Sequence, residues 1–301
     1  MKKKFTYYLH GLTVHSEIEL PELSPRPGVV PDVQIQLGAL DPIPLNPERP
    51  WGNHFLAPNQ VLINIKDVAK FFVSEGKEIL IDPYPHAEGK AIRLYLLGSS
   101  MGCLLHQRRL LPIHANALQH EHECVMFMGQ SGMGKSTLAA AMKNRGYKVL
   151  ADDLCAVKTS SGGKSVIYPG VPQIKLWKDA ADHLDEDIAL MKRVLSDEEK
   201  YALPVDDTYC RHPLPIKCIY ILNFYDGKDL KIIDLNLLEK LAVIKRNTYR
   251  KGMVDKMGIS AIHLKMSGQL AAATPIRQIL RPHDSLMHIN ELINAIEDDV
   301  P

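Results

Sequence analysis

The sequence has little that would indicate a secreted, membrane-spanning or nucleic-acid-binding protein. Its five cysteines are scattered and form no CxxC pair, which argues against a disulfide framework and a zinc ribbon. The formal net charge is +1, from 36 Lys and Arg against 35 Asp and Glu, so no strong overall field attracts nucleic acid or an anionic membrane. The most apolar stretch, Leu94–Leu105, is too short to span a bilayer, and polar residues interrupt any signal-peptide core after the basic start. We expect a soluble, cytoplasmic protein with neither nucleic-acid nor membrane partners.

The composition is that of a globular protein with a sizeable core. Hydrophobic residues make up 46% of the 301 positions and charged residues 24%, which is ordinary usage for a folded chain. Short strand-like runs and abundant proline over residues 1–88 predict a small, mostly β domain. From residue 89 the pattern changes: apolar residues between Leu94 and Leu105 recur on one helical face, and strands then alternate with helices. We therefore expect an N-terminal domain over 1–88 and an α/β domain over 89–301.

One segment of the α/β domain carries a phosphate-binding pattern. Residues 129–136 match G-x-x-x-x-G-K-[ST] in full, between the apolar run Val125–Met128 and a helix-forming run. Glycines let consecutive backbone N–H groups point at phosphate oxygens, and the helix N-terminus adds its dipole. Lys135 would reach the β- and γ-phosphates, and the Ser136 hydroxyl would ligate Mg²⁺. The predicted nucleotide contacts are Gly129, Ser131, Gly132, Met133, Gly134, Lys135, Ser136 and Thr137.

Two adjacent carboxylates, Asp152 and Asp153, close the next strand-like run, Tyr147–Ala151. Strand, helix and strand over so short a span predict a parallel strand pair joined by a crossover. Carboxylates at the end of such a strand stand where Mg²⁺ and the attacking group of a phosphoryl transfer must sit. One could accept the proton of a substrate hydroxyl while the other holds the metal or Lys135. The alternative is that the two aspartates only cap a turn.

Other polar residues are weaker candidates on their own. His114 lies in an apolar strand-like run, Leu111–Leu118, where a histidine is more often structural than catalytic. A basic cluster after a predicted helix contains Arg246 and Arg250, which could clamp a phosphate or a peptide carboxylate through bidentate contacts. Positive residues at a helix C-terminus also simply favour the helix dipole, so both readings stay open. Charged sequence over 185–200 predicts a further helix.

Together these residues resemble the catalytic core of the bacterial HPr kinase/phosphorylase family. The resemblance runs from His114 through 129–137 to the segment 145–153, Arg-Gly-Tyr-Lys-Val-Leu-Ala-Asp-Asp, with matching gaps to Lys135 and Asp152. It implies a P-loop, α/β core with a fold akin to phosphoenolpyruvate carboxykinase, and an ATP-dependent protein serine kinase. Carried over, Lys135 and Ser136 bind phosphates and Mg²⁺, Asp152 is the acid/base, and Asp153 and His114 support it. Ser136 and Asp153 are the expected ligands of Mg²⁺.

The sequence departs from that family at two points. Thr137 stands where the family usually has Glu after G-K-S, and its downstream E-I-R-G-x-G signature is not visible near Tyr168–Trp177. The pattern around Leu111–Ala115 and Tyr168-Pro169 looks closer to HPr-kinase-like proteins found with lasso-peptide biosynthesis, which phosphorylate a serine at the precursor peptide's C-terminus. Because related kinases assemble, a homo-oligomer is among the states that the resemblance implies.

We therefore expect an ATP- and Mg²⁺-dependent kinase whose partner is a peptide or small protein carrying the acceptor serine. A small-metabolite kinase with the same site, and a nucleotide-binding regulator that transfers no phosphate, are the alternatives. The N-terminal domain lacks any chemical constellation, so acceptor recognition is the role predicted for it.

Overall fold

The computed structural model describes residues 4–26, 30–40, 52–57, 59–195, 198–283 and 289–301. The chain forms two compact units, which are described separately. The first contains residues 1–110 and 250–263, and the second contains residues 111–249 and 264–301. No helix among the described residues is long and apolar enough to cross a membrane.

The first unit is built on a seven-stranded sheet with the order β1-β2-β3-β7-β6-β5-β4. β2, β3 and β7 run parallel, and the other neighbours are antiparallel. Alternate residues such as Phe71 and Val73 are fully buried, as expected for strands with one face on a core. The strands are β1 (Phe5–Leu9), β2 (Leu12–Ser16), β3 (Val33–Leu37), β4 (Gly52–Ala57), β5 (Gln60–Ile65), β6 (Ala69–Ser74) and β7 (Glu78–Pro83).

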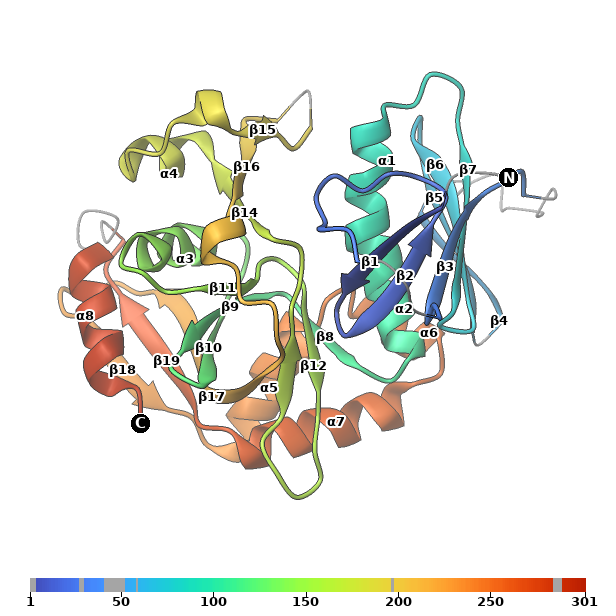
Figure 1. Cartoon of the computed structure of the whole chain (residues 1–301). Helices are drawn as coiled ribbons and strands as arrows, with labels where there is room; N and C mark the ends of the chain where they lie inside the picture. The colour runs from blue at the N-terminus through green and yellow to red at the C-terminus, as the bar shows by residue number, and fades with distance from the viewer. Residues whose placement is uncertain (1–3, 27–29, 41–51, 58, 196–197, 284–288) are drawn as a thin grey trace. The chain divides into compact units, whose positions relative to one another are not determined.

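A continuous helical segment packs on this sheet (Figure 1). It consists of α1 (Gly89–Tyr95), the π-helical turn η1 (Leu96–Ser100) and α2 (Met101–Gln107), and η1 and α2 contact β6. The apolar stripe predicted between Leu94 and Leu105 is therefore the face that covers the sheet, with Met101, Leu104 and Leu105 fully buried. The division between the units consequently falls after Leu110 rather than at residue 88. The short helix α6 (Gly252–Lys256) also belongs to this unit.

The second unit contains a mixed sheet in which β11, β9, β10, β17, β19 and β18 follow one another. β10, β17 and β19 are parallel, while β9 pairs antiparallel with both β10 and β11. The expected parallel pair is therefore not adjacent: β9 lies between β10 and β11, and the parallel partner of β10 is β17. These strands are β9 (Ala115–His120), β10 (Glu123–Met128), β11 (Val149–Ala151), β17 (Leu214–Phe224), β18 (Lys231–Asp234) and β19 (Ile276–Arg281).

Two smaller groups of strands extend this unit. β8 (Leu111–Ile113), β12 (Cys155–Lys158) and β13 (Val166–Tyr168) form an antiparallel branch that joins the first residues of β17. β14 (Gln173–Trp177), β16 (Lys200–Pro204) and β15 (Lys192–Arg193) form a separate three-stranded sheet. The helix predicted over 185–200 is wrong: that stretch contains the 3₁₀ turn η2 (Ile188–Leu190) and β15. Leu184, Ile188 and Met191 have helical spacing and pack against the core, but pairing of β15 with β16 outweighs this local pattern.

Helices cover the central sheet of the second unit. α3 (Lys135–Asn144) and α8 (Ile289–Asp299) pack against one another and share a core with alternate residues of β10 and β17, including Phe127 and Tyr220 (Figure 1). The remaining helical segments are α4 (Lys178–His183), η3 (Asp206–Thr208), α5 (Leu237–Asn247) and α7 (Ser260–Ala273), the last of which begins in the first unit. A P-loop α/β unit and a smaller, mostly β N-terminal unit confirm the expected α/β class.

Candidate active site

The predicted phosphate-binding loop connects the end of β10 at Met128 to the start of α3 at Lys135. Gly129, Gly132 and Gly134 all have positive φ angles, of 149°, 84° and 69°, which L side chains rarely adopt. At Gly129 a Cβ atom would also lie 2.9 Å from the carbonyl oxygen of Leu222 on β17. The pattern of glycines is thus required by the backbone path, and the loop leads directly into a helix N-terminus, the arrangement that binds phosphate.

Lys135 is held over this loop rather than directed into solvent. Its ammonium donates to the carbonyl oxygens of Gly129, at 2.8 Å, and Gln130, at 3.1 Å. Only 7% of the residue is exposed. Burial lowers the pKa of Lys135, while the negative charges of Asp152 and Asp153 oppose that shift. The side chain is therefore a cation fixed between the loop and the carboxylates.

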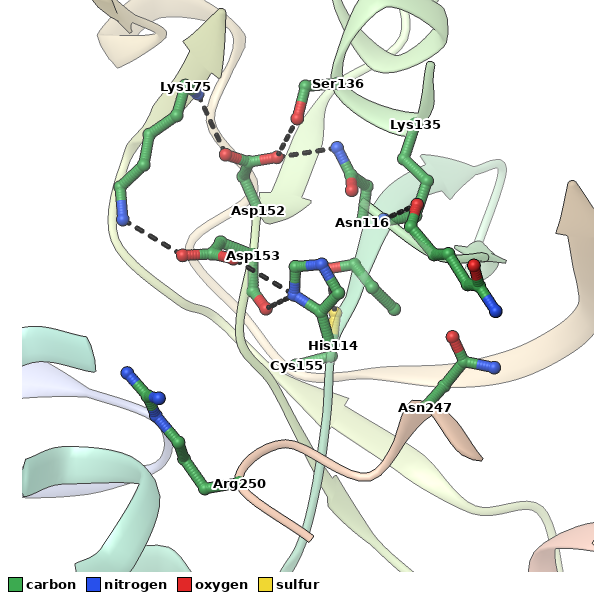
Figure 2. Close-up of polar contacts among 12 residues, drawn as sticks. His114, Asn116, Lys135, Ser136, Asp152, Asp153, Cys155, Lys175, Asn247 and Arg250 are labelled. Atoms are coloured by element: carbon green, nitrogen blue, oxygen red, sulfur yellow. Dashed lines mark hydrogen bonds and ion pairs between the residues drawn. The ribbon is translucent and has the colours of Figure 1, made fainter. Parts of the chain in front are cut away.

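Asp152 is the centre of a hydrogen-bond cluster (Figure 2). Its Oδ1 accepts from Asn116 Nδ2 at 2.6 Å and from the Ser136 hydroxyl at 3.2 Å, and its Oδ2 accepts from the backbone N–H of Lys175 at 2.9 Å. The residue is 8% exposed. Burial, followed by the neighbouring charge of Asp153, raises the pKa of Asp152 to about 6. This carboxylate can therefore take up a proton near neutral pH.

Asp153 has different neighbours, although it is the next residue. Its two carboxylate oxygens contact His114 Nδ1 and Lys175 Nζ, each at 3.0 Å. Burial alone would raise the pKa of Asp153, but the Lys175 charge and the His114 hydrogen bond outweigh it and hold the pKa well below its usual range. A left-handed backbone, with φ at 68°, turns this side chain away from the direction of its neighbour. Asp153 is therefore ionised and anchored.

Strand order explains why these residues meet. β10 and β11 are parallel, so the P-loop and the two aspartates leave the sheet at the same edge. β9 runs antiparallel between them and starts at that edge, which brings His114 and Asn116 beside the aspartates. His114 also interrupts the predicted strand Leu111–Leu118, which the structure divides into β8 and β9.

The structure places the other predicted site residues as follows. Ser136 contacts Asp152 rather than Asp153, its predicted partner at a metal ion. Thr137 is buried in the first turn of α3, and Ser131 is exposed in the loop. Arg246 is exposed on α5, whereas Arg250 belongs to the first unit, where its guanidinium donates to the Ser99 hydroxyl at 2.6 Å. The phosphate clamp assigned to these two arginines stays a prediction.

Sequence reasoning missed three residues of the site: Asn116, Lys175 and Asn247. Asn247, at the end of α5, accepts the Gly129 N–H at 3.2 Å and so supports the start of the P-loop. Asn116 lies two positions after His114, the spacing that puts both side chains on one face of an extended segment, and this signal could have been used. Lys175 carried no signal, because its strand joins the site only through tertiary contacts.

Arg281 ends β19 and is almost wholly buried, with 1% exposed. Its Nη2 donates to the carbonyl oxygen of Met133 in the P-loop, and its guanidinium stacks over the ring of Phe224 at 4.5 Å. Its Nε and Nη1 have no hydrogen-bond partner among the described residues. A buried cation therefore braces the outer side of the P-loop, directly against Gly134.

Fold and site together define an α/β protein with a P-loop and a facing pair of carboxylates. No protein-family model matches the chain, and no curated protein matches it. Among solved structures, the chain is similar to the Hpr(Ser) kinase/phosphatase from Coxiella burnetii, at 16% identity and a TM-score of 0.33. The alignment covers 62% of this chain and 95% of that one.

Proposed function

We propose that the protein is an ATP- and Mg²⁺-dependent kinase that phosphorylates a serine hydroxyl of a peptide or small protein. The observation that carries this proposal is the contact between Ser136, the first hydroxyl after the P-loop lysine, and the buried carboxylate of Asp152. It joins a phosphate-binding loop to an acid/base group within one cluster. The lasso precursor peptide suggested by the sequence resemblance is one acceptor of this class.

The P-loop would hold the phosphates of ATP. Backbone N–H groups of the glycine-rich turn and the ammonium of Lys135 are the donors for the β- and γ-phosphate oxygens. Because Lys135 is already fixed by two carbonyl oxygens, little reorganisation accompanies binding. Positioning and charge stabilisation supply most of the rate in such a transfer.

The donor set around Ser136 fits Mg²⁺. The Ser136 hydroxyl is a hard oxygen ligand and lies 3.2 Å from Asp152 Oδ1, so it combines a donor atom for the ion with a negative charge beside it. The Ser136 hydroxyl would hold the ion, which leaves the Asp152 carboxylate available for proton transfer. Asp153, the partner of Ser136 expected from the sequence, is paired with His114 and Lys175. Bound there, Mg²⁺ would neutralise charge on the phosphate oxygens.

The two carboxylates then divide the remaining work. Asp152, with a pKa of about 6, is the better proton acceptor for the serine hydroxyl. Asp153, paired with Lys175 and His114, would orient the cluster and hold its charge. Transfer forms a bond between the serine oxygen and the γ-phosphorus, breaks the bond from that phosphorus to the bridging oxygen of ADP, and leaves the hydroxyl proton on Asp152.

Incubation with γ-labelled ATP and Mg²⁺ tests the proposal. Serine peptides, small hydroxyl compounds and a reaction without acceptor are run in parallel. Label on a peptide serine supports the proposal, label on a small compound supports a metabolite kinase, and tight nucleotide binding without transfer supports a regulator. Lys135→Ala should weaken transfer strongly, whereas Lys143→Ala, on the same helix but ion-paired with Glu186, should not.

A further inference from the structure

The outer edge of β14 offers main-chain groups beside the candidate active site. In the sheet order β14-β16-β15, β14 has a strand neighbour on one side only. Lys175 lies opposite Ala202, and Trp177 opposite Lys200. The Lys178 N–H donates to the Glu199 carbonyl oxygen, and the Val205 N–H donates to the Pro172 carbonyl oxygen, so these are hydrogen-bonded pairs. In an antiparallel ladder, hydrogen-bonded and non-hydrogen-bonded pairs alternate between them. Lys175 and Trp177 fall in unbonded pairs, so their N–H groups point away from β16.

One of these outward groups already contacts the catalytic cluster. The Lys175 N–H donates to Asp152 Oδ2 at 2.9 Å. Two residues along the same edge, the Trp177 N–H has no hydrogen-bond partner among the described residues, and 47% of Trp177 is exposed. Two residues of a strand span about 6.6 Å, so this edge ends within one dipeptide of Asp152.

The face that accompanies this edge is basic. Alternation places Lys175, Trp177, Lys200 and Lys192 on the same side of the small sheet, opposite the buried Ile174 and Leu176. The Lys200 ammonium lies over the Trp177 ring, 5.4 Å from its centroid. Lys192 is exposed at the far strand. The Lys175 ammonium is paired with Asp153, so Lys192 and Lys200 supply the charge on this face that complements acidic side chains.

We propose that the outer edge of β14 binds the acceptor as an extended, acidic peptide that adds a strand to the β14-β16-β15 sheet and so delivers its serine hydroxyl to Asp152. The inference rests on the proposed kinase function and specifies its acceptor. Main-chain hydrogen bonds to the Lys175 carbonyl and the Trp177 N–H give affinity in this mode of recognition, and alternate side chains give specificity. Because Asp152 occupies the Lys175 N–H, the added strand stops where the carboxylate begins.

The first test asks whether alternate backbone amides of the acceptor peptide contribute unequally, as strand pairing requires. The probe is a twelve-residue peptide with one central serine between alternating valine and aspartate residues. Two N-methylated versions are compared: one carries methyl groups on the backbone amides of the odd-numbered residues, and the other on those of the even-numbered residues. A strand presents alternate N–H groups to its neighbour, so only one version can pair. We expect about tenfold or greater loss of kcat/KM for one version and little change for the other. Equal effects of the two versions would overturn the inference.

The second test changes the protein. Trp177→Pro removes the edge donor without forcing the backbone, because φ at Trp177 is −72° and proline requires about −65°. Trp177→Ala is the matched control, since it removes the ring but keeps the N–H. Relative to Trp177→Ala, Trp177→Pro should raise KM for the peptide about three- to tenfold and leave nucleotide affinity unchanged.

The outcomes separate the inference from the function on which it rests. Peptide phosphorylation in the wild-type protein with equal KM for Trp177→Pro and Trp177→Ala would overturn strand addition and leave the kinase proposal standing. Replacing the aspartates of the peptide by lysines should lower kcat/KM at low salt by about tenfold, and an unchanged value would overturn the acidic preference. Phosphorylation of small hydroxyl compounds but of no peptide would overturn both proposals.

Discussion

At the scale of single residues, Asp152 and Asp153 show how two identical groups acquire different chemistry. Both are carboxylates at the end of one short strand, yet burial and the charge of Asp153 raise the pKa of Asp152 to about 6. The one that faces an ammonium and a histidine has its pKa lowered. Groups whose environments push their pKa values apart can serve as base and as fixed charge in one site.

The shift at Asp153 predicts a stabilising role. Because its pKa is lower in the folded than in the unfolded state, its contribution is present above about pH 4 and is lost as the pH falls further. Asp153→Asn should therefore destabilise the protein at pH 7 by about 2 kcal/mol, and the difference should shrink below pH 4. Asparagine tolerates the left-handed backbone at this position, so the change tests charge and not strain. Urea denaturation across pH 3–8 measures it, and a constant difference over that range would contradict the assignment.

Asp152 should behave in the opposite sense. Its pKa rises from 3.8 to about 6 on folding, so the folded state retains a proton that the unfolded state has released. Wild-type stability should therefore fall between pH 4 and pH 6, by about 3 kcal/mol from this group alone. Asp152→Asn removes that dependence, so the variant should gain stability relative to wild type as the pH rises to 7.

The same variant should lower phosphotransfer by about 10²–10⁴-fold while it still binds nucleotide. Transfer close to the wild-type rate would remove Asp152 from the role of base.

At the scale of elements, the P-loop depends on how closely β17 approaches it. Gly129 has both a left-handed φ and the Leu222 carbonyl oxygen 2.9 Å from its virtual Cβ, whereas Gly132 has a left-handed φ and open space around it. The two positions therefore separate backbone strain from steric collision. Sequence alone marks both as glycines of one pattern and cannot rank them.

Alanine substitutions should reveal that difference. Gly132→Ala should cost about 1 kcal/mol of stability, the strain of a left-handed residue. Gly129→Ala should cost about 2–4 kcal/mol, because a backbone oxygen of the neighbouring strand must also move. Chemical denaturation with both variants measures the two costs. Equal values would mean that the β10–β17 contact does not constrain the loop.

Elements with a strong local signal could be predicted from the sequence, and elements defined by tertiary partners could not. The glycine pattern, the helix after it and the apolar strands β10 and β17 follow from local rules. The insertion of β9 between β10 and β11 does not, because strand order depends on contacts that a local pattern does not carry. Lys175 was missed for the same reason: the sequence marks it only as one lysine in an alternating strand, and its role depends on where β14 ends in space.

At the scale of the whole molecule, the chain leaves the first unit after Leu110 and returns to it for residues 250–263. In the returning segment Met253, Val254 and Met257 are buried, and the Lys256 ammonium lies over the ring of Phe55, 5.5 Å from its centroid. The predicted boundary at residue 88 rested on a change in residue pattern, because strand-like runs give way to a helical pattern there. That helix nevertheless covers the sheet of the first unit, and an amphipathic stripe does not specify the sheet on which it packs.

The effect of a truncation should therefore depend on whether it removes both segments of the first unit. Deleting residues 1–88 leaves the apolar face of α2 and the buried methionines of 250–263 without a partner, so this variant should aggregate. Deleting residues 1–110 and also replacing 250–263 by a Gly/Ser linker removes the whole unit, and this variant should stay soluble and bind nucleotide through its P-loop. Size-exclusion chromatography and calorimetry with ATP and Mg²⁺ measure both properties. If the predicted acceptor role of the first unit is correct, the soluble variant should show a raised KM for peptide but an unchanged affinity for nucleotide. A monomeric, folded 89–301 fragment would instead restore the boundary that the sequence suggested.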